Sequence, residues 1–159
     1  MPHDTIVSKD NLHQNWAAVD NAIRTAKQVS QSPVDVWCVV SFDGVYMGTV
    51  WSQPRTQEGP TNHAEDRFFG GYSLNMIADF IDQFGRFPDR LRLTLKYSPC
   101  NKRNDDREDR CTFKIADDRE FWSSIEVRYD KQYTNPQHDM QGSQAALRKA
   151  GVSSGFHYY

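Results

Sequence analysis

Apolar residues recur with helical spacing in some segments of this chain and with strand-like spacing in others, and their order limits the fold. Residues 34–42 and 45–51 are rich in Val, Phe, Trp and Tyr, and Asp43-Gly44 joins them. An Asp-Gly pair between two apolar runs is a strong signal for a β-hairpin. The segment before the hairpin, about 10–30, has apolar residues at helical spacing and predicts an amphipathic helix.

After the hairpin, predicted helices alternate with predicted strands. One helix begins near His63 and ends at Gly85, and the pair Gly70-Gly71 weakens or kinks it near its start. Strands are predicted at 91–95, 125–129 and 152–159, with a short helix after Cys111 and another over 143–150, capped by its first residue Ser143. About twenty residues with a helix separate the last two strands, which makes them parallel. The order therefore predicts a layered α/β/α fold with a five-stranded mixed sheet whose last two strands are parallel.

The length and composition indicate an ordered globular protein. A chain of 159 residues corresponds to one domain, and we expect 1–159 to be a single domain. Hydrophobic residues make up 38% and aromatic residues 13%, which argues against disorder. No apolar run approaches the roughly 18 residues of a membrane-spanning helix, and the start of the chain does not resemble a signal peptide. We expect no membrane partner, and either a cytoplasmic protein or an exported effector domain that acts in the cytoplasm of a target cell.

Three cysteines are too few for a disulfide scaffold. Cys38 lies in an apolar run and is predicted to be a buried core residue. Cys100 and Cys111 have polar neighbours, which leaves them open as metal ligands or as incidental thiols. The residues between them, 101–110, include no apolar side chain and predict a solvated loop. The net charge is −2, but 86–114 has nine Lys or Arg against five Asp or Glu, so a phosphate-binding patch and an ordinary solvated face both remain open.

One group of residues could hold a metal ion. His63, Cys100 and Cys111 offer an imidazole nitrogen and two thiolates, and such a set can bind Zn²⁺ and leave a fourth position for water. Glu65, two residues after the histidine, is placed to move protons to and from that water. A helix start and the end of the next strand are where α/β sheets place their sites.

The motif His63-Ala64-Glu65, followed by Pro99-Cys100, resembles the signature H-x-E … P-C-x-x-C of the zinc-dependent cytidine deaminase superfamily. Within it the chain looks most like the AID/APOBEC-type polynucleotide deaminases and the bacterial toxin deaminases. Tyr97-Ser98-Pro99-Cys100 resembles their Trp-Ser-Pro-Cys, and 145–152 resembles their last helix entering a parallel final strand. The cysteine spacing departs from the signature, since ten residues replace two, and this variable spacing resembles the toxin branch.

The resemblance implies a role for each residue that matches. His63, Cys100 and Cys111 would bind Zn²⁺, and Glu65 would shuttle protons. The Ala64 N–H and the Ser98 carbonyl would hold the pyrimidine edge. Tyr97 would line the base pocket, and Tyr133 would stack a flanking base. Asn62 and Trp51 flank the site and are weaker candidates.

The resulting hypothesis is hydrolytic deamination of cytosine to uracil in single-stranded nucleic acid, DNA rather than RNA, by a toxin or effector domain. We expect a monomer, and a toxin would imply a neutralising immunity protein. Two alternatives from other classes remain open, a deaminase of free cytidine or its nucleotides, and a zinc-stabilised module that binds nucleic acid or protein without catalysis. Adenine remains open as the target base.

Overall fold

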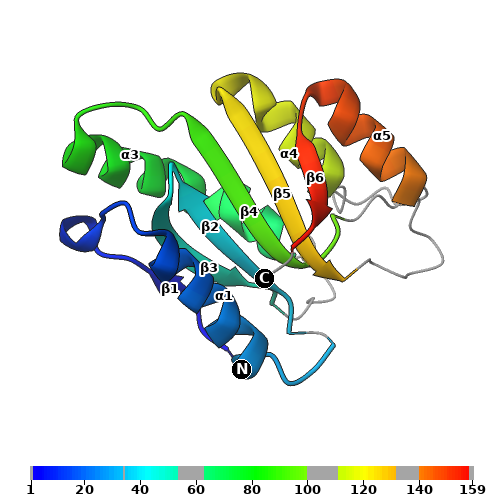
Figure 1. Cartoon of the computed structure of the whole chain (residues 1–159), viewed down its shortest axis with the longest axis horizontal. Coiled ribbons are helices and arrows are strands. Elements are labelled where there is room, and N and C mark those ends of the chain that lie inside the picture. Colours follow the sequence, from blue (N-terminus) through cyan, green and yellow to red (C-terminus); the bar gives the residue numbers. More distant parts are fainter. Residues whose placement is uncertain (1, 34, 54–62, 100–110, 132–139, 158–159) are drawn as a thin grey trace.

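The computed structural model describes residues 2–33, 35–53, 63–99, 111–131 and 140–157. In these residues a six-stranded sheet carries helices on both faces (Figure 1). The strands are β1 (Thr5–Ile6), β2 (Trp37–Phe42), β3 (Val45–Trp51), β4 (Arg90–Tyr97), β5 (Ser124–Lys131) and β6 (Ser153–Phe156). The helices and helical turns are η1 (Lys9–Asn11), α1 (Trp16–Val29), α2 (Ala64–Arg67), η2 (Phe68–Tyr72), α3 (Ser73–Phe84), α4 (Cys111–Asp118), η3 (Arg119–Phe121) and α5 (Met140–Ala150).

The sheet has the order β1-β3-β2-β4-β5-β6. The pairs β1/β3, β3/β2 and β2/β4 are antiparallel, whereas β4/β5 and β5/β6 are parallel. The predicted layered α/β fold and its parallel final pair are therefore confirmed. The sheet has one strand more than predicted, because β1 is too short to give a periodic signal in the sequence.

Helix α1 covers one face of the sheet. Its buried side chains Val19, Ile23 and Ala26 contact a cluster that includes Trp37 and Trp51 from the hairpin strands. Asn15 caps this helix by accepting a hydrogen bond from the Ala18 N–H at 3.2 Å. The helix thus begins at Trp16 rather than near residue 10, because the cap and the short turn η1 interrupt the helical spacing.

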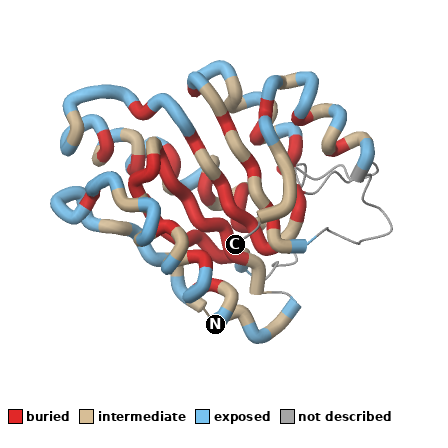
Figure 2. Tube along the Cα trace, in the orientation of Figure 1, coloured by how far each residue is buried: buried red, intermediate tan, exposed pale blue. Residues whose placement is uncertain are grey.

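The helices after the hairpin cover the other face, where the larger apolar core lies. This cluster joins strand residues such as Cys38 and Leu93 to Ala64, Ile115 and Leu147 from α2, α4 and α5. Cys38 is fully buried, as predicted. Buried residues run along the sheet and exposed ones follow the outer sides of the helices (Figure 2). In the described part of the chain, no helix combines the length and the apolar character needed to cross a membrane.

Three helix details confirm, refine or correct the expectation from the sequence. The predicted weak point at Gly70-Gly71 is a π-helical turn, η2, between α2 and α3. Gly85 ends α3 in the left-handed conformation, with φ of +71°, as its position predicts. Ser143 was expected to cap the last helix, but α5 begins at Met140 and Ser143 is buried within it. The hydroxyl bonds across to another helix instead of to its own helix end.

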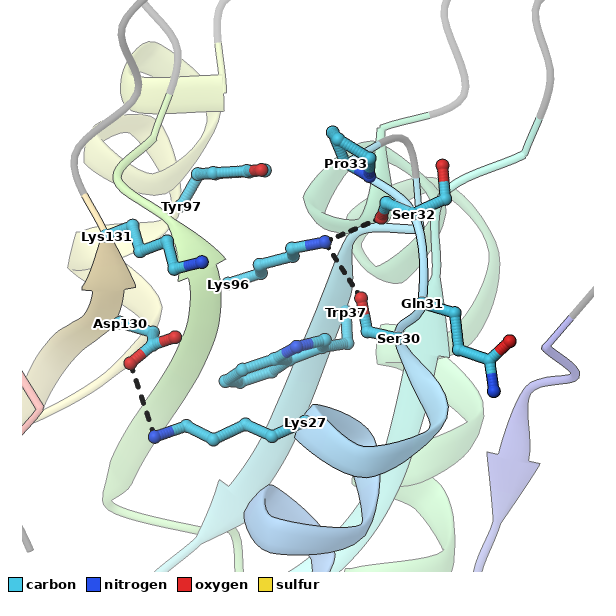
Figure 3. Close-up of a pocket in the computed structure, with 10 residues that line it drawn as sticks. All are labelled: Lys27, Ser30, Gln31, Ser32, Pro33, Trp37, Lys96, Tyr97, Asp130 and Lys131. Carbon is cyan, nitrogen blue, oxygen red and sulfur yellow. Dashed lines mark hydrogen bonds and ion pairs between the residues drawn. The ribbon is translucent and has the colours of Figure 1, made fainter.

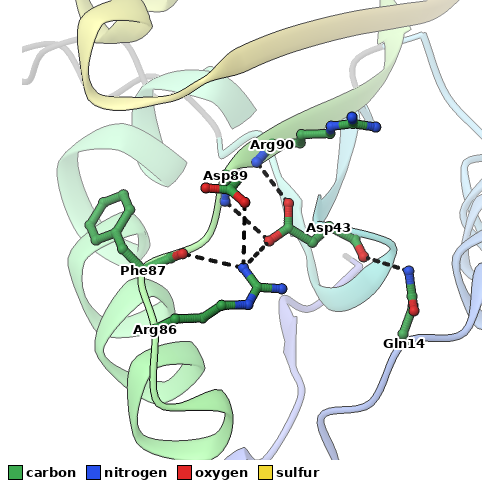
Figure 4. A network of polar contacts seen from close by, with 6 residues as sticks. All are labelled: Gln14, Asp43, Arg86, Phe87, Asp89 and Arg90. Carbon is green, nitrogen blue, oxygen red and sulfur yellow. Dashed lines mark hydrogen bonds and ion pairs between the residues drawn. The ribbon is translucent and has the colours of Figure 1, made fainter.

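A polar network closes the end of the sheet where the hairpin turns (Figure 4). Asp43 adopts φ of +52° beside Gly44 at +81°, the left-handed pair that a tight hairpin turn requires. Its carboxylate accepts hydrogen bonds from the N–H groups of Asp89 and Arg90 at 3.1 and 2.8 Å and from Arg86 Nη1 at 2.8 Å. These bonds join the hairpin to the start of β4. The opposite end of the sheet, where β3 and β4 finish, holds the candidate site.

Candidate metal centre

His63 and Glu65 lie together where helix α2 begins. His63 is the N-cap residue, with extended backbone angles (φ −61°, ψ 151°), and Ala64 and Glu65 follow in the first turn. Ala64 is fully buried and Glu65 is only 5% exposed. Acidic residues in a first helical turn interact favourably with the helix dipole, which helps to explain why the helix starts at this point.

Cys111, the first residue of α4, brings a sulfur atom to the same point. Its side chain is fully buried, and its Sγ lies 3.4 Å from Nδ1 of His63. The potential ligand atoms of His63, Glu65 and Cys111 lie within 4.8 Å of one another. An imidazole, a thiol and a carboxylate this close form a group that could hold a metal ion.

The charge of the buried Glu65 carboxylate acts on two nearby titratable groups, Cys38 and Lys114. Burial raises the pKa of the Cys38 thiol well above its usual value, and the Glu65 charge raises it further. Burial lowers the pKa of Lys114, and the Glu65 charge opposes that shift. Lys114 also forms an ion pair with Asp66, which follows Glu65 in the helix. Glu65 is therefore close enough to act on a thiol that stays neutral and on a lysine that is paired with Asp66.

A buried hydroxyl pair ties Cys111 to the end of β4. Thr112 Oγ1 lies 2.6 Å from Ser143 Oγ, and both hydroxyls lie near the Pro99 carbonyl oxygen, at 3.4 and 3.3 Å. Pro99 precedes Cys100 and Thr112 follows Cys111. The chain positions next to the two cysteines are thus held together, although ten residues separate the cysteines in sequence.

A second polar cluster fixes helix α2 from outside. Arg67, one turn after His63, donates from Nη1 and Nη2 to the Asp4 carboxylate at 2.9 and 2.5 Å, and Nη1 also donates to the Trp51 carbonyl. Tyr72 OH donates to the same carboxylate at 2.5 Å, and the Trp51 N–H donates to it at 2.8 Å. Asp4 therefore connects the first strand, the end of β3 and the helix that carries His63.

The other predicted site residues fall in different environments. Ser98 is buried, and its N–H donates to the Lys131 carbonyl at 2.9 Å. Tyr97 is half-buried and lines a pocket on the α1 side of the sheet. Trp51 is buried in the apolar cluster under α1, on the face opposite Ala64. Three further predicted residues lie outside the described residues, namely Cys100, Asn62 and Tyr133.

Four residues around this centre carry no sequence signal that points to it. Asp4 and Arg67 are distant in sequence, and their pairing appears only once β1 adds to the sheet edge. Thr112 and Ser143 are ordinary hydroxyl residues whose contact depends on how α4 and α5 meet. Thr112 directly follows Cys111, and that adjacency is the one hint the sequence offers.

Comparison with known proteins gives a fold and no sequence relative. No protein-family model and no curated protein matches the sequence. Among solved structures, a dCMP deaminase from the cyanophage S-TIM5, in complex with dCMP and dUMP, superposes with a TM-score of 0.51 at 19% identity, covering 89% of this chain and 94% of that one. The Rib2 deaminase of Aspergillus oryzae superposes with a TM-score of 0.52 at 14% identity, covering 88% of this chain and 82% of that one. The chain therefore has the fold of these deaminases.

Proposed function

We propose that this protein is a zinc-dependent hydrolase that deaminates cytosine to uracil. The observation that carries the proposal is the meeting of His63, Glu65 and Cys111 within 4.8 Å, in a fold shared with known deaminases. The donor set fits zinc, because imidazole and thiolate are ligands that this ion prefers. Cys100 is the proposed third ligand, since its neighbour Pro99 contacts Thr112 beside Cys111.

The chain's own groups supply the proton transfers of the reaction. Bound zinc would act as a Lewis acid that makes water reactive near neutral pH. We assign Glu65 to take one proton from the attacking water and deliver it to ring nitrogen N3. Glu65 then takes the proton of the hydroxyl formed at C4 and gives it to the departing amine, so both water protons are accounted for. Water adds at C4 and ammonia leaves, so cytosine and water give uracil and ammonia. The Ala64 N–H and the Ser98 carbonyl are assigned to hold the pyrimidine edge.

The proposed substrate is single-stranded nucleic acid, DNA rather than RNA, and the proposed role is that of a toxin or effector domain. The parallel β5/β6 pair supports this, because it matches the feature by which the chain resembles polynucleotide deaminases. The second candidate is deamination of a free nucleotide, and the structural similarity to a deaminase bound to dCMP favours it. Sequencing of DNA and RNA from cells that express the protein would show whether a polymer is modified, and in which sequence context.

The direct test compares substrates and one variant in vitro. Zinc-loaded protein is incubated with cytosine-containing single-stranded oligonucleotides, with dCMP and with cytidine, and uracil is measured by excision or chromatography. Glu65→Gln should lower turnover by about 10²- to 10⁴-fold and keep the zinc content. The matched control is Glu120→Gln, which removes the same charge from an exposed residue and should leave turnover unchanged. Absence of uracil from every substrate, with zinc bound, would refute the proposal.

A further inference from the structure

A pocket rich in lysine lies on the α1 side of the sheet (Figure 3). Its lining includes Tyr97, the last residue of β4, so the pocket lies at the end of the sheet where β4 finishes. Its volume is about 300 Å³. The walls come from the end of α1 and the residues after it, and from the last residues of β4 and β5. The lining residues are Lys27, Ser30, Gln31, Ser32, Pro33, Trp37, Lys96, Tyr97, Asp130 and Lys131.

Lysines outnumber carboxylates in this lining. Lys27, Lys96 and Lys131 contribute three positive charges, and Asp130 contributes the one negative charge. Asp130 pairs with Lys27 at 3.2 Å, and its charge also acts on Lys96, as does the charge of the nearby Asp35. With three lysines and one carboxylate, the lining itself still offers an anion an excess of two positive charges.

Lys96 organises the wall of this pocket. The side chain is only 8% exposed, and Nζ donates to Ser30 Oγ and the Ser32 carbonyl at 2.8 Å each, and to the Asp35 carbonyl at 3.2 Å. These three bonds hold the segment after α1 against β4. Burial first, and then the nearby Lys131 ammonium, lowers the pKa of Lys96, and the charges of Asp35 and Asp130 oppose this shift only in part. The two lysines therefore repel each other, and an anion between them would relieve that repulsion.

Lys131 is the residue best placed to contact such an anion. It is exposed at the end of β5, and its side chain extends toward β4 and Lys96 (Figure 3). Its carbonyl accepts the Ser98 N–H, so the pocket and the chain that leads to Pro99 share a backbone contact. Pro99 in turn contacts Thr112 beside Cys111. The pocket is thus connected to the candidate metal centre through two consecutive residues of one strand end.

We propose that this pocket binds a phosphate group of the nucleotide substrate, with Lys131 as the direct contact and Lys96 as the fixed charge behind it. The proposal rests on the proposed function, and it specifies a substrate that carries phosphate. Two sources share this chemistry, the backbone of a single strand and the phosphate of a free nucleotide. The serine hydroxyls of Ser30 and Ser32 belong to the same wall.

The test measures the binding of probes that carry phosphate and of one that does not. Affinities for cytidine, dCMP, inorganic phosphate and a cytosine-containing oligonucleotide are measured on the Glu65→Gln protein, where turnover does not interfere. Adding Lys131→Gln should weaken the binding of the phosphate-bearing probes about three- to tenfold and leave cytidine binding unchanged. Adding Asp130→Asn should strengthen phosphate binding, because it removes the carboxylate that competes for Lys27. Lys149→Gln, on exposed α5, is the charge-matched control.

The outcomes separate the two sources and the two proposals. A backbone phosphate predicts that the loss is confined to the oligonucleotide, with the slope of log affinity against log salt reduced by about 0.7. A free nucleotide predicts the same loss for dCMP. Equal binding of every phosphate-bearing probe by Lys131→Gln and Lys149→Gln would overturn this inference. If phosphate binding responds as expected but no uracil forms with the wild-type protein, the proposed function is refuted and the phosphate-binding role of the pocket is supported.

Discussion

Asp4 is expected to be one of the most stabilising charged residues outside the core, although it lies in a segment without a sequence signal. The perturbation is Asp4→Asn, which keeps the side-chain shape, removes the charge opposite Arg67 and replaces one acceptor oxygen by a donor NH₂. In the structure the carboxylate accepts four hydrogen bonds, from two guanidinium nitrogens of Arg67, from Tyr72 OH and from the Trp51 N–H. The asparagine cannot satisfy these donors together.

The burial of the pair sets the magnitude. The side chains of Asp4 and Arg67 are 12% and 19% exposed. Breaking a fully buried ion pair costs about 3–5 kcal/mol, and an exposed pair contributes about 0.2–1 kcal/mol. This pair is close to the buried limit, so Asp4→Asn should lower the free energy of unfolding by about 2–4 kcal/mol. At about 3 °C per kcal/mol for a chain of this length, the Tm should fall by about 6–12 °C.

Urea unfolding and thermal melting followed by circular dichroism would measure the effect. The matched control is Asp10→Asn, an exposed aspartate in the turn η1, which should stay within about 0.5 kcal/mol of the wild type. Tyr72→Phe removes one donor from the cluster and should cost about 1 kcal/mol. If Asp4→Asn were no more destabilising than Asp10→Asn, the role of Asp4 in fixing helix α2 would be refuted.

Three further predictions follow from single residues. Burial by itself raises the pKa of Asp4, but the hydrogen bonds from Arg67, Tyr72 and the Trp51 N–H outweigh it and lower that pKa. The ionised carboxylate therefore contributes its full stabilisation above its unfolded pKa of about 3.9, and this contribution is lost as the pH falls through the lower folded pKa. The free energy of unfolding of the wild type should fall below about pH 4, and Asp4→Asn should lack this part of the decrease. Cys38 is fully buried and its pKa is raised, so an alkylating reagent at about pH 8 should modify it only in denaturant. Labelling of Cys38 in the folded protein, detected by mass spectrometry, would contradict its buried placement. Gly85→Ala should destabilise the protein by about 1 kcal/mol in urea unfolding, because φ is +71° and no atom lies near the added Cβ to compensate; a neutral or stabilising result would show that this backbone strain has no cost.

The sequence predicts the fold well where local chemistry decides the structure. Asp43-Gly44 forms the hairpin turn and Gly85 ends α3, because both positions need left-handed backbone angles. The helix between the last two strands makes them parallel, a consequence of chain length and handedness. The expectation for Ser143 was wrong because α5 begins earlier, at Met140, so Ser143 lies inside the helix and its hydroxyl contacts Thr112. Strand β1 was missed because the tertiary bonds of Asp4, rather than periodicity, keep it at the sheet edge.

The candidate centre is predictable in the same uneven way. His63 and Glu65 occupy the helix start that their spacing predicted, and Cys111 begins a helix and meets His63. The bonds between Asp4 and Arg67 that fix α2, and the hydroxyl pair beside Cys111, depend on contacts between segments far apart in sequence. No local pattern encodes such contacts, because each residue alone is an ordinary polar side chain. The roles assigned to the site residues, Tyr97 and Trp51 included, stay predictions.

The contact between Pro99 and Thr112 has a consequence for protein engineering. Because the hydroxyls of Thr112 and Ser143 hold the Pro99 carbonyl, the chain leaves β4 and enters α4 at neighbouring points. The sequence between these two points can then be exchanged as a cassette, and its length costs little in closure entropy. A library that varies 101–110 in length and charge, with both cysteines kept, should therefore preserve the contacts that hold Thr112 and Ser143 beside Pro99.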